Sequence, residues 1–219
     1  MSSNNASRPV RLLAISASSR QGSLNGKLVA LAARKAQALG AEVTHVDLRE
    51  LDMPLYDEDW ATAHGKPAGA LRLRELFARH DGLLLASPEY NALPTPLLLN
   101  SLDWLSVVPA QEGAGGLPGG TGTTAGKPVG LMAASPGALG GIRALPIVRT
   151  YLSTNFAMVV VPEQLALPQA DQQLVDPQRL ARADLDAALD RLVASVVRQA
   201  RWRVAEAEAE AEVQTPQAS

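Results

Sequence analysis

The sequence contains no cysteine, which excludes disulfides, thiolate catalysis and cysteine-ligated zinc or iron–sulfur clusters. A chain without cysteine is compatible with the cytoplasmic location that we expect. The chain has only three histidines, His45, His64 and His80, and their spacing matches no set of metal ligands. We therefore expect no metal site.

Long apolar runs and a strong charge of one sign are also absent. No stretch is long and charge-free enough to span a bilayer, and the N-terminal MSSNNASRP lacks the apolar region of a signal peptide. The net charge is −2 and the basic residues are scattered, so we expect neither nucleic acid nor membrane insertion. The 219 residues, 47% of them hydrophobic, suffice for one domain with a full core.

Short apolar segments alternate with segments of helical periodicity. The predicted strands cover residues 10–15, 42–48, 82–86, 128–134 and 158–162, and the predicted helices cover 24–39, 68–79, 97–107, 142–155 and 177–203. This alternation predicts an α/β fold with a three-layer, doubly wound, five-stranded parallel sheet over residues 9–203. Residues 42–48 alternate in polarity, which predicts a strand near an edge of the sheet.

The two ends of the chain are expected to be disordered or frayed. Residues 1–8 are polar, and residues 204–219 place Glu206 opposite Glu210 and Glu208 opposite Glu212 at like-charge i,i+4 spacing.

Two internal segments have irregular patterns. Residues 52–67 form an acidic loop whose Tyr56 and Trp60 could cover the site or a neighbouring subunit. Residues 109–126 contain seven glycines and are predicted to be a mobile surface loop or an insertion near a site. Between these segments, Leu97, Leu98, Leu102 and Trp104 are expected in the core or at a subunit interface.

The first predicted strand breaks into small polar residues and then opens a helix. The loop contains Ser16, Ser18, Ser19, Arg20, Ser23 and Asn25. A helix N-terminus beside hydroxyl groups favours a phosphate, because unpaired N–H groups and the helix dipole attract an anion. The alternative is that Ser and Asn only cap the helix and close a turn.

The third and fourth predicted strands end in similarly unusual loops. Residues 87–91 are SPEYN and residues 135–141 are SPGALGG. The carboxyl ends of parallel strands share one edge of the sheet, where ligands of such folds bind. Three polar loops at this edge predict a ligand site there.

Several other motifs fail. Residues 122–128 lack the first glycine and the final Ser/Thr of a P-loop and precede a strand, and no G-x-G-x-x-G follows the first strand. Ser135 cannot be the nucleophile of a hydrolase triad, because no histidine follows His80. An acid/base pair of Glu89 and Asp103 is disfavoured, since one follows a strand and the other lies within a predicted helix.

The three loops together resemble those of the NADPH-dependent FMN reductase family, a flavodoxin-like group that contains flavin, quinone, azo-dye and chromate reductases. The first motif stands here as residues 17–25, with Ala17 where the family usually has Gly. The second is residues 87–91, continuing to Pro94, Asn100, Asp103 and Trp104, and the third is residues 135–141. The resemblance covers about residues 10–201 and implies a flavodoxin-like fold.

The resemblance also implies the roles of individual residues in binding FMN. The phosphate would be held by Ser18, Arg20, Ser23 and Asn25, with the backbone N–H groups of Ser23, Leu24 and Asn25. The ring would lie along Pro88, Glu89, Tyr90 and Asn91, with Ser135, Gly137, Gly140 and Gly141 on its other side. No residue is assigned a catalytic role, although Tyr90 or water could protonate the acceptor.

The implied function is an NAD(P)H-dependent FMN oxidoreductase that passes hydride from NADPH to flavin N5. A quinone, free flavin, azo dye or metal oxyanion would then take the electrons. The alternatives are a flavodoxin-type electron carrier, which the small net charge disfavours, and a module that binds phosphate with the first loop alone. Members of the family commonly form dimers and tetramers, so the resemblance implies a homodimer or homotetramer, with residues 97–107 as the candidate interface. The acceptor and the preference for NADPH or NADH stay open.

Overall fold

The computed structural model describes residues 8–214. Its centre is a five-stranded, wholly parallel sheet in the order β2-β1-β3-β4-β5. The strands are β1 (Arg11–Ser16), β2 (Glu42–Asp47), β3 (Gly82–Ala86), β4 (Pro128–Ala134) and β5 (Val159–Leu167). This is the doubly wound order of flavodoxin-like folds, and it confirms the predicted fold class.

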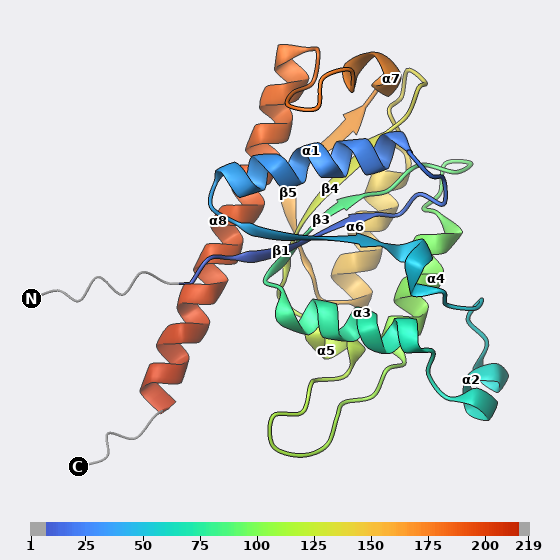
Figure 1. The fold of residues 1–219 in the computed structure, drawn as a ribbon, viewed down its shortest axis with the longest axis vertical. Helices are drawn as coiled ribbons and strands as arrows, with labels where there is room; N and C mark the ends of the chain where they lie inside the picture. Colours follow the sequence, from blue (N-terminus) through green and yellow to red (C-terminus); the bar gives the residue numbers. More distant parts are fainter. Residues whose placement is uncertain (1–7, 215–219) are drawn as a thin grey trace, which may run out of the picture.

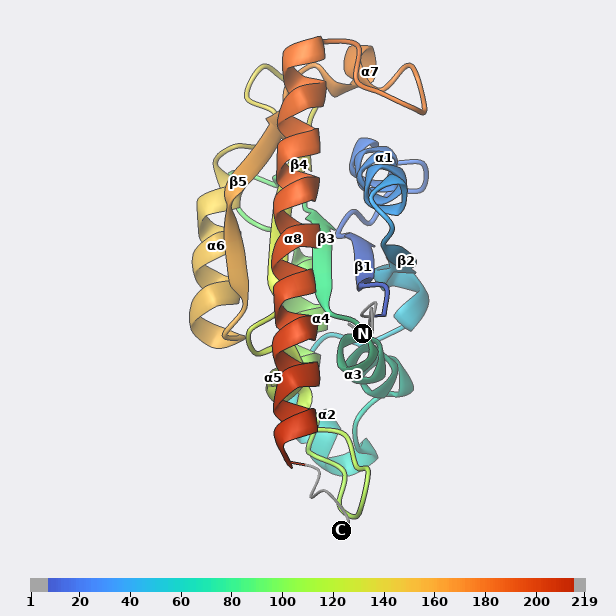
Figure 2. The same cartoon turned by 90° about the vertical axis from the view of Figure 1, so that its left-hand side faces the viewer.

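Helices cover both faces of the sheet (Figures 1 and 2). One face carries α1 (Leu24–Ala38) and α8 (Ala183–Gln214), and the other carries α3 (Ala68–Arg79), α4 (Pro96–Ser106) and α6 (Ala144–Asn155). Four short helices complete the fold: η1 (Leu48–Leu51), α2 (Glu58–His64), α5 (Gly120–Thr124) and α7 (Ala170–Gln173).

The strand period of two divides the core between the faces. Leu12 and Ala14 pack with α1 and α8, whereas Leu13 and Ile15 pack with α3, α4 and α6. Every residue of β3 and β4 is buried, as expected for central parallel strands, while β2 is partly exposed at the edge. The ends of β1, β3 and β4 therefore lie in the interior of the sheet, away from its exposed edge strand.

Several predicted boundaries need correction. The last helix begins at Ala183, because residues 177–182 form an irregular, bent segment, and it continues to Gln214 where a frayed tail was expected from residue 204. Strand β5 extends to Leu167, five residues beyond the prediction. Arg8, placed in the N-terminal tail, forms an ion pair with Asp81. The rest of the tail predictions, residues 1–7 and 215–219, lies outside the described residues.

The acidic segment packs on its own chain. Tyr56 and Trp60 contact Trp104 edge-on, with ring centroids 5.1 and 5.6 Å apart, and the Trp104 indole N–H donates to the Pro54 carbonyl. Trp104, Leu98 and Leu102 are buried within this chain, which confirms them as core residues. The two aromatic side chains of this segment thus anchor α2 to α4.

The glycine-rich segment lies away from the carboxyl edge. It connects the end of α4 to the start of β4, so it belongs to the edge where the strands begin (Figure 1). The Arg74 guanidinium donates to the Pro109 carbonyl at 3.0 Å, and Gln111 N–H donates to the Leu117 carbonyl at 2.8 Å. The expectation of an insertion near the site is therefore wrong. No helix among residues 8–214 is long and apolar enough to cross a membrane.

Candidate functional site

The first loop leaves β1 in a conformation that other strands fix. Ala17 N–H donates to the Ala86 carbonyl at 2.9 Å, and the Thr95 hydroxyl donates to the Ala17 carbonyl at 2.8 Å. Ala17 is fully buried, and it is not among the described non-glycine residues with positive φ. Alanine therefore replaces the glycine of the family motif without backbone strain.

The N-terminus of α1 is capped, yet it keeps free donors. Ser23 Oγ accepts a hydrogen bond from Gly26 N–H at 3.0 Å, so the capping interpretation is correct for this residue. The N–H groups of Leu24 and Asn25 have no partner within the helix, and no acidic residue lies in the first turn. The positive end of α1 is therefore available to an anion.

Arg20 is the free cation of this loop. Its backbone N–H donates to Ser18 Oγ at 3.3 Å. The residue is exposed. Within residues 8–214 that guanidinium has no hydrogen-bond or ion-pair partner. A guanidinium beside an open helix N-terminus suits a phosphate, which accepts bidentate hydrogen bonds from it.

Asn25 has another use for its side chain. Its amide accepts from Ala134 N–H and donates to the Ala134 carbonyl, both at 2.9 Å, and the residue is buried. The side chain therefore ties the start of α1 to the end of β4. Of the groups of Asn25, the backbone N–H is the one that stays available to a phosphate.

Glu89 of the second loop binds the start of α6. Its carboxylate accepts from the Arg143 side chain at 2.7 Å and from the N–H groups of Arg143 and Ala144 at 2.8 and 3.2 Å. Burial opposes the charge of Glu89, but these hydrogen bonds hold the pKa of its carboxyl below the ordinary value. Asp103 instead accepts from the Tyr151 hydroxyl at 2.9 Å, so the two carboxylates have separate structural partners.

The second loop ends in a tight and strained turn. Asn91 and Ala92 have φ values of 52° and 66°, and Tyr90 and Leu93 exchange two backbone hydrogen bonds of 3.0 Å. Asparagine tolerates this left-handed conformation better than alanine, for which it costs about 1 kcal/mol. The Tyr90 hydroxyl lies 3.3 Å from Ser19 Oγ, which joins the second loop to the first.

The third loop packs against the end of β5. Ser135 N–H donates to the Leu167 carbonyl at 3.1 Å, and Ser135 Oγ accepts from Gly137 N–H at 3.1 Å. Gly140 has φ +63°, and a Cβ there would lie 2.7 Å from backbone atoms of Leu167 and Pro168. A Cβ at Gly141 would lie 2.8 Å from Ala133 Cβ. Packing alone therefore explains these two glycines.

The three loops enclose one cavity of about 130 Å³. Its lining includes nine of the thirteen expected site residues: Ser18, Arg20, Ser23, Leu24, Asn25, Pro88, Glu89, Tyr90 and Ser135. Asn91, Gly137, Gly140 and Gly141 do not line it, whereas Ala134 and Pro136 do so without having been predicted. It lies at the carboxyl edge between β1 and β3, where the strand order reverses: β2 is added on one side of β1 and β3 to β5 on the other. This is the usual ligand position of this architecture.

The residues around this cavity fit a phosphate and a flat ring. Free helix N–H groups and Arg20 address an anion, and Pro88, Tyr90 and Pro136 offer flat apolar surfaces next to it. The volume is below the roughly 300–1,000 Å³ of pockets that enclose a whole ligand. A flavin nucleotide bound here would therefore project into solvent. Among the described residues, no three His, Asp or Glu side chains lie together as metal ligands do.

Comparisons with known proteins agree with this geometry. A family model described as NADPH-dependent FMN reductase matches residues 10–172. A quinone reductase of Escherichia coli K12 is 33% identical over 172 residues, which cover 78% of this chain and 84% of that protein. An NAD(P)H-dependent FMN reductase of Pseudomonas aeruginosa is 35% identical over 136 residues, 62% of this chain and 65% of the relative.

Solved structures show the same fold. The flavoenzyme NAD(P)H:(acceptor) oxidoreductase FerB from Paracoccus denitrificans superposes with a TM-score of 0.69 at 21% identity. The superposition covers 88% of this chain and 98% of the FerB chain.

Proposed function

The chain belongs to the NADPH-dependent FMN reductase family, and on that premise we propose that it binds FMN in the cavity between the three loops and catalyses reduction of a small-molecule acceptor by NAD(P)H. One observation carries the proposal: loops from β1, β3 and β4 meet at one cavity, where the N-terminus of α1 and Arg20 are free to take an anion.

Each loop has a distinct part in this proposal. Ser18, Arg20 and Ser23, with the N–H groups of Leu24 and Asn25, hold the phosphate. Pro88 and Tyr90 lie along one side of the ring, and Ser135 and Pro136 close the other side. Glu89 positions the second loop through its hydrogen bonds with Arg143, and the Asn25 side chain positions the first loop through its hydrogen bonds with Ala134. We assign neither side chain a contact with the reacting atoms.

When bound, FMN would supply the redox chemistry, which is uptake of hydride from NAD(P)H and two-electron reduction of the acceptor. The protein binds and orients the ring. Protonation of the acceptor is assigned to Tyr90 or to water, and no other side chain is given a catalytic role. Because relatives of the chain are named quinone reductases, a quinone is the first acceptor to test.

Assembly and location extend the proposal. We place the chain in the cytoplasm as a homodimer or homotetramer. Most apolar side chains of α4 are used within the chain, and Leu97 and Leu99 are the partly exposed ones that remain for a partner. Size-exclusion chromatography with light scattering gives the oligomeric state directly.

The proposal is tested by titrating the purified protein with FMN and then adding NADPH without oxygen. We expect a shifted flavin absorbance on binding, followed by bleaching near 450 nm when NADPH is added. Bound flavin that stays oxidised would indicate an electron carrier instead. Absence of flavin binding would refute the assignment of the cavity and leave only the fold.

A further inference from the structure

A second cavity, larger than the one between the three loops, lies on the other side of the first loop. Its volume is about 340 Å³, and it runs between α1 and the edge strand β2. The two cavities share Ser18, Arg20 and Ser23, so they adjoin across the first loop. We call this space the α1–β2 groove. Its size is within the range of small-molecule sites. That of the cavity between the three loops, which we call the ring cavity, is below it.

The groove carries excess positive charge. Arg20, Lys27 and Arg49 line it, and Asp47 is the one carboxylate among its lining residues. Asp47 is already paired, because Arg49 Nε lies 2.9 Å from Asp47 Oδ1, and the hydrogen bonds from Arg49 hold the pKa of this carboxyl below its ordinary value. Within residues 8–214 the ammonium of Lys27 has no hydrogen-bond or ion-pair partner.

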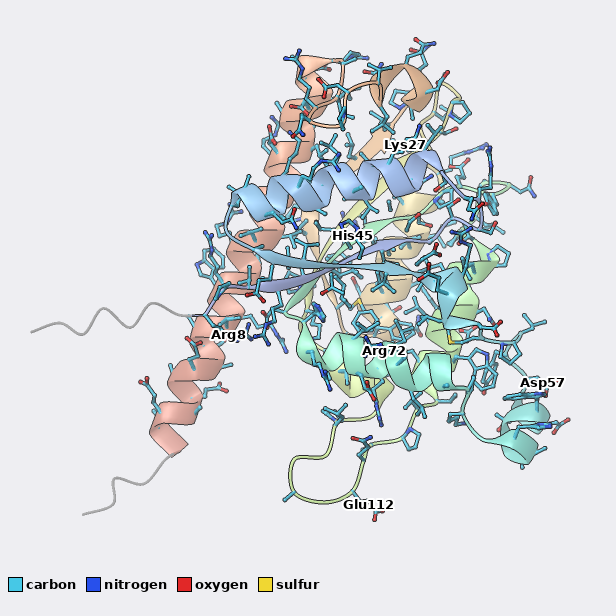
Figure 3. All side chains as sticks on the ribbon, in the orientation of Figure 1. Arg8, Lys27, His45, Asp57, Arg72 and Glu112 are labelled. Atoms are coloured by element: carbon cyan, nitrogen blue, oxygen red, sulfur yellow. The ribbon has the colours of Figure 1, made fainter. Side chains whose placement is uncertain are left out.

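Lys27 and Arg49 are not needed by the ring cavity. Neither residue lines that cavity, whereas both line the groove. Lys27 projects from α1 one turn after the capped N-terminus, and His45 lies on β2 across from it (Figure 3). The ring cavity therefore does not account for these two cations.

The rest of the groove is apolar and roomy. Gly26 lines α1 with no side chain, and Val46 and the His45 ring contribute surfaces on which a flat base can pack. Cations beside such surfaces are the chemistry that recognises a phosphorylated nucleoside. In dinucleotide-binding folds, an acidic residue near the end of the second strand takes the ribose 2′-hydroxyl of NAD, whereas an arginine near this position accommodates the 2′-phosphate of NADP. By analogy, Arg49 stands near that place here, and it pairs the charge of Asp47 at the end of β2.

We infer that the α1–β2 groove binds the adenosine half of NADPH, with Lys27 and Arg49 on its 2′-phosphate. The inference rests on the proposed function and deepens it, since it assigns the choice of NADPH over NADH to two named residues. The groove and the flavin site are neighbours, because the two cavities share lining residues of the first loop.

The first test measures binding of 2′,5′-ADP and 5′-AMP to the protein by calorimetry, with FMN present at saturation. We expect 2′,5′-ADP to bind at least about tenfold more tightly, because a charged hydrogen bond contributes that much or more. Lys27→Ala reduces this difference, and Lys66→Ala, a control between α2 and α3, keeps it. Equal binding of the two probes, or a difference that Lys27→Ala leaves unchanged, overturns the inference.

The second test separates the groove from the flavin site. Lys27→Ala and Arg49→Ala are expected to lower kcat/KM for NADPH at least about tenfold while leaving the value for NADH and the Kd for FMN unchanged. Displacement of 2′,5′-ADP by FMN would place the probe's phosphate at the N-terminus of α1 and refute the groove. A failure of FMN binding with Lys27-dependent binding of 2′,5′-ADP would refute the proposed function alone.

Discussion

Polar residues where the strands of the sheet begin differ from those where the strands end in whether they have partners within the chain. Where the strands begin, Lys127, His80 and Asp81 are buried, and each has a partner within the chain. Where the strands end, the first turn of α1 and Arg20 keep free donors beside a cavity. Polar composition therefore does not distinguish the edges. A functional site is found where polar groups lack internal partners.

At the edge where the strands begin, which we call the opening edge, the hydrogen-bond partners of Asp81 and His80 all lie within the chain. The Asp81 carboxylate accepts two hydrogen bonds of 2.7 Å from Arg8 and one of 2.8 Å from Arg11 N–H. His80 Nδ1 lies 2.6 Å from the Leu76 carbonyl, so it carries the proton, and Nε2 accepts from the Thr44 hydroxyl at 2.8 Å. Burial lowers the pKa of His80, which favours this neutral ring. Substitutions here should change stability and leave ligand binding intact.

The largest effect is expected from Gly140→Ala. The positive φ and a Cβ 2.7 Å from backbone atoms force the third loop away from β5, which should cost about 3 kcal/mol or more. Gly137→Ala is the matched control, because its Cβ would lie 3.5 Å from Ser135 Oγ without a positive φ. Urea unfolding measures both. Equal stabilities of the two variants would contradict the packing role of Gly140.

Asn25→Ala should have the next largest effect. It leaves the N–H and carbonyl of Ala134 buried without partners, so we expect a loss of about 2–4 kcal/mol in the free energy of unfolding. Asn155→Ala, at an exposed position near the end of α6, should change it by less than about 0.5 kcal/mol. If Asn25→Ala weakened FMN binding at full stability, its side chain would be a ligand group after all.

Lys127 makes stability depend on pH at the opening edge. Burial lowers the pKa of its ammonium to about 8, against 10.5 for an unperturbed lysine. Between these values the unfolded chain holds a proton that the folded chain has released, so stability rises with pH. We expect a gain of about 2 kcal/mol from pH 8 to 10. Lys127→Met should flatten this rise, measured by urea unfolding at each pH, and an unchanged slope would refute the assignment.

The fold could be predicted from the sequence because its signals are local. Central strands are short apolar runs, and each ends where polar and small residues begin a loop. Strand β5 was predicted too short because Pro162, Glu163 and Gln164 interrupt its apolar run. The last helix continues past residue 203 because alanine and glutamate favour helix strongly enough to outweigh like charges at i,i+4.

The internal ties of the site could not be predicted. Asn25 meets Ala134 across 109 residues and Glu89 meets Arg143 across 54, and no local pattern records such pairs. The motif placed these residues at the right edge but could not separate ligand groups from groups that position the loops. Likewise, the packing of Gly140 against the end of β5 and of Gly141 against Ala133 is visible only in three dimensions.

The central claim is that the carboxyl edge holds a phosphate with groups that the fold does not use. The most direct measurement is the Kd for FMN of the unaltered protein, Arg20→Ala and Arg72→Ala, the last an exposed arginine on α3. Arg20→Ala should raise the Kd about ten- to hundredfold with unchanged stability, because it removes a charged hydrogen bond, while Arg72→Ala leaves the Kd unchanged. An FMN Kd unaffected by Arg20→Ala would contradict the account.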